Sequence, residues 1–235
     1  MADPVPAKAV AALPLLLLLL SVSTGLVDAI SVLGLGKVFT ANMTGNVVFL
    51  GFAAAGTPGF TVAPYLVAIA SFLIGAMIAG RTGKAQIGRP MRHWLIKAAL
   101  IEAALLWIAA VVAIGFDIAT QSPSGRLYAI IPLTGLAMGF RNGTIRQLKV
   151  PDLTTTVLTL TLTGLAADSA IAGGSNPNWP RRIAAVVAIF AGAAAGAFLV
   201  INSGLALPLA IAGGLVLFGT LACALHPSAG LPAGA

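Results

Sequence analysis

Residues 25–51 read GLVDAISVLGLGKVFTANMTGNVVFLG, and the interpretation of the whole chain starts from this stretch. It places an acid, Asp28, inside a long apolar run, and a polar segment, 42–46, at the start of the next apolar run. An ionised carboxylate in a lipid bilayer is costly unless it is neutralised, paired or hydrated. The stretch therefore predicts a membrane helix that carries a functional or helix-joining polar site.

Composition agrees with a membrane location. Of the 235 residues, 59% are hydrophobic and 8% are charged, whereas a soluble domain has about 25% charged residues. Several apolar runs are long enough to span a bilayer, which predicts an all-α, polytopic membrane helix bundle. The net charge of +7 arises largely from residues 81–97 and 141–149. Short basic loops are expected at the cytoplasmic face, so the charge does not indicate nucleic-acid binding.

The apolar runs predict eight helices. A cleaved signal peptide is an alternative for the first run, but that run is longer than a signal core. The tail, 227–235, is predicted to be flexible. The predicted helices are residues 11–35, 42–56, 61–80, 93–116, 126–148, 153–168, 183–201 and 204–225.

An internal repeat organises these helices. Residues 25–29 align with 139–143, about 114 positions later, and residues 44–47 align with 159–162. The chain is therefore predicted to be a single membrane domain, 1–235, with pseudo-symmetric four-helix repeats. Their predicted ranges are about 11–116 and 126–225.

The topology has two alternatives, because segments 42–56 and 153–168 are short for a span of about 20 residues. Only residues 57–60 separate the first of them from the next helix, which favours eight full crossings and repeats that point the same way. Six crossings with two re-entrant helices would place more Lys and Arg on one side, which the positive-inside rule favours.

The intramembrane polar residues are the candidate binding site. Asp28 is predicted to be a proton or cation site, or a structural carboxyl paired with Arg141. Arg141 is alternatively predicted to contact Asp152, an anionic substrate or a lipid headgroup. Asn42 is expected to cap its helix, and Thr155, Thr159 and Thr163 share one helical face. The full candidate set for substrate or ion binding is Asp28, Asn42, Thr44, Asn46, Arg141, Asn142 and Thr159.

No catalytic, cofactor or metal site is predicted. One cysteine, Cys223, and two distant histidines make a metal site improbable, and no nucleophile motif or phosphate loop is present. Glu102 lies inside a helix and is predicted to cap the helix, to pair with Lys97 or to relay protons. Asp117, Asp152 and Asp168 are predicted to be solvated or helix-capping residues. The chain is therefore not expected to be an enzyme.

The motifs resemble the YoaK family of bacterial inner-membrane proteins, which is catalogued as a domain of unknown function. The resemblance covers nearly the whole chain. It implies a multi-pass protein of the bacterial cytoplasmic membrane and no settled activity. Two departures occur in the second repeat, where Thr159-Leu160 replaces the usual Thr-Gly and Arg141-Asn142 replaces Gln-Asn. The motifs that carry the resemblance are GLVDA at 25–29, VFTANMTGN at 38–46, MGFRN at 138–142, PDLTTT at 151–156 and TLTG at 161–164.

Two functions follow from these patterns. Duplicated repeats with polar, helix-breaking elements at matching depth are typical of transporters, so the leading hypothesis is a transporter or exporter of a small solute or ion. The alternative is a non-transporting module that binds lipid or a partner, with structural polar residues. The expected partners are the bilayer, an unknown small solute or ion, and a second copy of the chain. Gly192 and Gly196 would allow close helix packing, within the chain or in that homodimer.

Overall fold

The computed structural model describes residues 12–86, 88–148 and 158–226, and this part is helical without strands. The prediction of an all-α membrane bundle with eight helices is confirmed. The α-helices are α1 (Ala12–Gly34), α2 (Met43–Ala54), α3 (Val62–Lys84), α4 (Met91–Val112), α5 (Ser124–Leu148), α6 (Leu158–Ala167), α7 (Trp179–Ser203) and α8 (Ala206–Ala224). One turn of 3-10 helix, Ala170–Ala172, follows α6.

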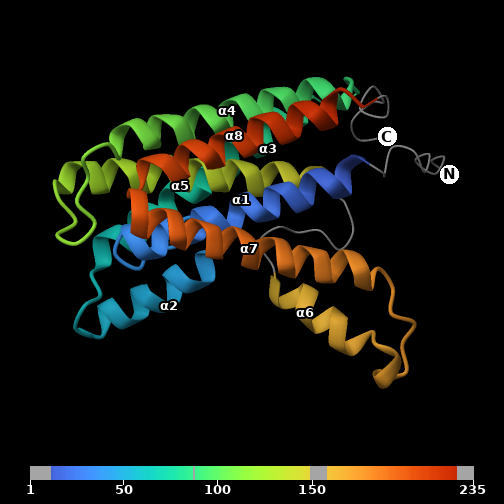
Figure 1. The fold of residues 1–235 in the computed structure, drawn as a ribbon, viewed down its shortest axis with the longest axis horizontal. Helices are drawn as coiled ribbons and strands as arrows, with labels where there is room; N and C mark the ends of the chain where they lie inside the picture. The colour runs from blue at the N-terminus through green and yellow to red at the C-terminus, as the bar shows by residue number, and fades with distance from the viewer. Residues whose placement is uncertain (1–11, 87, 149–157, 227–235) are drawn as a thin grey trace.

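Six long helices lie side by side and form the bundle (Figure 1). Five of them, α1, α3, α4, α7 and α8, are long and apolar enough to cross a membrane. The sixth, α5, has 25 residues and is the more polar helix, with Arg141 and Thr134 buried. Polar groups within a membrane must be shielded from lipid, and α5 packs against both α3 and α4.

The two short helices do not span the bundle. α2 has 12 residues and the described α6 has 10, so they measure about 18 and 15 Å at 1.5 Å per residue. A membrane core is about 30 Å thick. Figure 1 shows that both begin near the middle of the bundle and run outward to opposite ends. The arrangement favours six crossings and two re-entrant helices over eight full crossings.

Corresponding helices of the two repeats run in opposite directions. The indole N–H of Trp107, late in α4, donates to the carbonyl of Ala210, early in α8, at 3.1 Å. Ala98, early in α4, and Thr220, late in α8, line the same cavity. The two helices are therefore antiparallel neighbours. The expectation that the repeats point the same way is wrong, because an axis that relates antiparallel partners lies in the membrane plane.

The two repeats also pack against each other reciprocally, since α3 lies along α5 and α7 lies along α1. A Cβ added to Gly139 would overlap the carbonyl of Phe72 in α3, and one added to Gly25 would overlap the carbonyl of Ile189 in α7. Gly25 and Gly139 are the aligned positions of the sequence repeat. Small residues at these two positions let the backbones approach closely.

Gly192 and Gly196 serve this packing within the chain. The backbone of Val22 lies against Gly192 and that of Leu26 lies against Gly196. These two glycines are therefore covered by α1. The expected homodimer stays a prediction. Gly192 and Gly196, which suggested it, contact α1 of the same molecule.

The two ends of the bundle differ in charge. The end where α3 ends and α4 begins, at the right in Figure 1, is called the basic end. The opposite end carries Lys37 and Arg126 among the described residues. The positive-inside rule predicts that the basic end faces the cytoplasm. The basic residues in or near this end are Arg81, Lys84, Arg89, Arg92, Lys97, Arg146, Arg181 and Arg182.

Candidate functional site

The loop between α1 and α2, residues 35–42, turns back into the bundle from the end of α1. Irregular backbone at membrane depth needs its N–H and C=O groups satisfied by protein or water. Asn46 of α2 supplies both partners for one residue. Its Oδ1 accepts from the N–H of Phe39 at 2.9 Å, and its Nδ2 donates to the carbonyl of Phe39. Asn46 is fully buried, so its amide holds the loop.

Asp28 approaches the same loop from α1. The backbone N–H of Ala41 hydrogen-bonds to its carboxyl group. Asp28 Oδ1 is buried and has no hydrogen-bond partner among the described residues, and the same holds for the hydroxyl of Thr40. Asp28 and Asn46 thus meet around loop residues 39–41. Two buried oxygens in this part of the loop remain available to a proton, a cation or water.

Arg141 contacts α1 about one helical turn before Asp28. Its Nε and Nη2 both contact Glu102 Oε1 of α4. Nη1 donates to Thr24 Oγ1 at 3.0 Å and to the carbonyl of Leu20 at 3.2 Å, and Nη2 donates to Ser23 Oγ at 2.9 Å. Arg141 is 1% exposed. The buried guanidinium therefore joins α1, α4 and α5 through a charge-assisted network.

The ion pair differs from the predicted pairings. Arg141 pairs with Glu102 rather than with Asp28, although Asp28 lies within electrostatic range of it. Glu102 therefore does not pair with Lys97, which is exposed. Asp152 lies outside the described residues.

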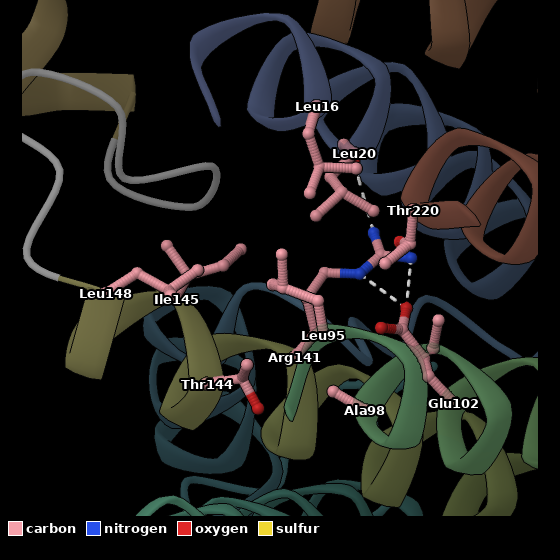
Figure 2. A pocket seen from close by; sticks show the side chains of 11 residues that line it. Leu16, Leu20, Leu95, Ala98, Glu102, Arg141, Thr144, Ile145, Leu148 and Thr220 are labelled. Atoms are coloured by element: carbon pink, nitrogen blue, oxygen red, sulfur yellow. Dashed lines mark hydrogen bonds and ion pairs between the residues drawn. The ribbon is translucent and has the colours of Figure 1, made fainter. Parts of the chain in front are cut away.

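A small cavity of about 30 Å³ adjoins the ion pair (Figure 2). Such a space holds one or two waters. Its lining is largely apolar and includes Leu16, Leu95 and Leu148. Thr144 and Thr220 also line it, and Figure 2 shows the Thr144 hydroxyl pointing away from it. Thr144 Oγ1 is buried without a partner in the described part of the chain.

The other candidate residues lie apart from these two groups. Asn42 occupies the N-cap position of α2 as predicted, but its side chain is exposed and makes no capping hydrogen bond, so that part of the prediction is wrong. Thr44 and Thr159 are exposed. Asn142 is half-buried and donates to the carbonyl of Met138 at 2.8 Å.

The predicted threonine face is only partly described. Thr159 and Thr163 of α6 are both exposed, whereas Thr161 is buried. Thr155 lies outside the described residues. The described part of α6 therefore directs its two predicted site hydroxyls away from the bundle core.

Sequence reasoning missed the partners of Arg141 on α1. Ser21, Ser23 and Thr24 form a small polar cluster directly after the leucine-rich start of α1, and this cluster was the available signal. Helical hydroxyls often bond to the carbonyl of the preceding turn, as Thr24 does to Leu20. That local role conceals the second one, in which Thr24 Oγ1 accepts from Arg141. No group of three metal-ligating side chains occurs among the described residues.

The fold and the buried charges define an integral, multi-pass membrane protein. A family model described as "Protein of unknown function (DUF1275)" matches residues 16–222. The chain belongs to this family. It is 36% identical over 154 residues to the UPF0700 transmembrane protein YoaK of Bacillus subtilis (strain 168). That match spans 65% of each chain, just under two thirds of the relative's length. No solved structure matches.

Proposed function

We propose that the protein is a transporter or exporter of a small solute or ion, with its polar site between the two repeats. The inverted arrangement of the repeats is the observation that carries this proposal. Transporters with inverted repeats bind substrate near the bilayer midplane, at the repeat interface and beside discontinuous helices. Here α2 and α6 begin near the middle of the bundle and run to opposite ends (Figure 1).

The buried ionisable groups support the same proposal. Asp28 from the first repeat and Arg141 from the second are within electrostatic range of each other, in neighbouring antiparallel helices. Ionisable residues inside a membrane commonly mark ion or proton pathways. In the proposal Asp28 is the proton or cation site, and its unpartnered Oδ1 is the atom that binds it.

A flux assay tests the proposal directly. Proteoliposomes loaded with a pH-sensitive dye are diluted into salts of alkali cations or of small carboxylates. We expect solute-dependent pH changes above those of protein-free vesicles, and their loss in Asp28→Asn. Asp117→Asn, in an exposed turn, is the matched control and should transport normally. Unchanged flux in Asp28→Asn would remove Asp28 from the mechanism, and no flux with any of these salts would contradict transport of these solute classes.

A lipid- or partner-binding module is the second candidate, and one observation favours it. A groove of about 380 Å³ lies between α3, α4 and α5, and its lining is apolar, including Ile78, Leu105 and Phe140. An acyl chain suits such a surface. In this case the buried charges would only join helices. Asp28→Asn would then alter stability, and neither the wild type nor the variant would show flux. Co-purification of a stoichiometric lipid with a flux-inactive protein would favour this candidate.

A further inference from the structure

We propose that the groove between α3, α4 and α5 binds one anionic phospholipid, whose headgroup Arg81 and Lys97 hold while an acyl chain lies along the groove. Such a site rests on the lipid-binding candidate above, whose ligand class it names, and it is compatible with transport. The helices α3 and α4 both pack on α5 and hardly on each other, so α5 forms the floor of the groove. The apolar lining includes Ile78 of α3, Ile101 of α4 and Phe140 of α5.

Two exposed cations lie at the basic end of this groove, one on each wall. Arg81 follows the lining residue Ile78 by three positions on α3. Lys97 precedes the lining residue Ile101 by four positions on α4. Residues three or four apart share a helix face, so the two cations extend the groove by about one turn, or about 5 Å. Neither side chain has an ion-pair or hydrogen-bond partner among the described residues, which leaves both available to a phosphate group.

No exposed acid offsets these two cations. Within the described helices α3, α4 and α5, Glu102 is the single acid, and it is 4% exposed and paired with Arg141. The basic end of the groove therefore has a net positive charge. Basic pockets between membrane helices bind acidic lipid headgroups. A zwitterionic headgroup gains less there, because its own positive charge offsets that of its phosphate.

The charged groove belongs to the first repeat alone. In the second repeat α7 and α8 take the places of α3 and α4, and α7 lies along α1 as α3 lies along α5. Residues 183–224, which include most of α7 and all of α8, contain no charged side chain. The two cations are therefore not needed for the helix packing that both repeats share. One anionic lipid per chain is the expected stoichiometry.

Native mass spectrometry of the detergent-solubilised protein tests the site. Phosphatidylglycerol is compared with phosphatidylcholine that has the same acyl chains. We expect one phosphatidylglycerol to bind per chain, about tenfold more tightly than phosphatidylcholine. Each cation near an anionic lipid contributes about fivefold in affinity, so Arg81→Gln combined with Lys97→Gln should weaken phosphatidylglycerol binding about 25-fold.

Lys84→Gln combined with Arg92→Gln is the matched control, because it removes the same charge from the basic end. Lys84 lies nine residues after the lining residue Gly75, and Arg92 lies nine residues before Ile101. Nine residues make about two and a half turns, which places each side chain on the opposite face of its helix. The control should bind phosphatidylglycerol about as tightly as the wild type. Equal weakening by both double variants, or equal affinity for the two lipids, would overturn the proposal.

Ala104→Phe tests the apolar part of the site, because Ala104 is an exposed lining residue and the added ring would fill the groove. It should weaken phosphatidylglycerol binding about fivefold or more. Val111→Phe, at a position of the same helix that is 67% exposed and outside the lining, should not. Unchanged binding in Ala104→Phe would overturn the assignment of the acyl chain to the groove.

Flux measured in parallel separates this site from the transport proposal. Selective phosphatidylglycerol binding without flux contradicts transport alone. Flux without selective phosphatidylglycerol binding contradicts the lipid site alone. Asp28→Asn leaves the groove intact, so it should bind phosphatidylglycerol like the wild type even where its flux is lost.

Discussion

Arg141 is the largest side chain that the bundle buries completely, and all of its charge is balanced by groups from other helices. Two charges removed from water are stable together only when geometry and additional hydrogen bonds compensate their lost hydration. Removing one of them leaves the other unpaired in a medium of low dielectric constant. Replacing one residue of the pair is therefore expected to destabilise the protein far more than replacing both residues together.

Glu102→Leu alone, or Arg141→Met alone, should reduce the free energy of unfolding by about 3–5 kcal/mol. The double variant should be less destabilised than the sum of the two, because neither charge is left alone. Equilibrium unfolding in mixed detergent micelles measures all three variants as a double-mutant cycle. Lys97→Met, at an exposed position one turn and a half before Glu102, is the control and should change little. Additive effects would contradict direct coupling.

Asp117 illustrates an acid outside the membrane-spanning segments. The hydroxyl of Thr120 donates to its Oδ2 at 2.7 Å and the N–H of Ala119 donates to its Oδ1 at 2.9 Å. These bonds hold the pKa of Asp117 below its usual value. Its ionised form therefore stabilises the turn above the ordinary carboxyl pKa, and this contribution is lost as the pH falls through the lowered pKa.

The expected consequence is a pH-dependent difference between wild type and Asp117→Asn. The wild type should unfold at a slightly higher temperature near neutral pH, and the difference should vanish well below about pH 4. Thermal unfolding across this pH range measures it. A difference that stays constant with pH would show that the carboxylate charge is not the cause.

At the scale of helices, glycines in the α1–α7 and α3–α5 contacts control how closely the repeats approach. Gly25→Val places a side chain against the carbonyl of Ile189 in α7, where the backbone cannot move aside cheaply. We expect a loss of about 1–3 kcal/mol or more, as for other overpacked interiors, and a low yield of folded protein. Gly51→Ala in α2 is the matched control, because nothing lies near its Cβ. Equal yields of the two variants would contradict the packing described for α1 and α7.

The two re-entrant helices are attached by different chemistry. Phe49 of α2 packs on Phe60 and on Tyr65 of α3, with ring centroids 5.3 and 5.9 Å apart. On the other side Asp168, just after α6, accepts from Arg182 of α7 at 2.6 Å. Tyr65 and Arg182 occupy equivalent positions in the two repeats. Tyr65 lies ten residues before Gly75 in α3, and Arg182 lies ten residues before Gly192 in α7.

Asp168→Asn should therefore loosen α6 and leave α2 unaffected. Asp168 is 44% exposed at its side chain, so the contact is partly screened by water and the effect should be modest. Hydrogen exchange of the protein in micelles would show faster exchange in residues 158–167. Phe49→Ala should produce the reverse pattern, in residues 43–54. Faster exchange in both helices for either variant would indicate that the attachments are not independent.

Much of this element-level description could be predicted from the sequence. Long apolar runs bounded by Gly, Pro and charged residues predict the helices within a few positions, because lipid imposes length and composition locally. The repeat was visible from Gly25 and Gly139. The pairing of Glu102 with Arg141 was not visible, because it joins residues 39 positions apart on different helices. The role of Asn46 depends on the path of residues 35–42, which no local pattern encodes.

At the scale of the whole molecule, the direction of the second repeat was the main error. The short connection after residues 42–56 predicts full crossings only for a helix that starts at the membrane surface. The structure starts α2 inside the bundle, so twelve residues suffice to reach the end where α3 begins. The charge asymmetry was the better guide, since it reflects the whole chain and the basic end gathers residues from both repeats.

The inverted topology is the claim on which the functional proposals depend, and site-specific labelling tests it most directly. Single cysteines are introduced in a Cys223→Ala background by Arg89→Cys, Thr120→Cys and Ser175→Cys, all at exposed loop positions. A membrane-impermeant maleimide is added to intact cells whose outer surface is accessible, and then to permeabilised cells. Six crossings with two re-entrant helices predict that position 120 reacts in intact cells, whereas positions 89 and 175 react only after permeabilisation. Labelling of position 175 together with position 120 in intact cells would contradict the inverted repeats.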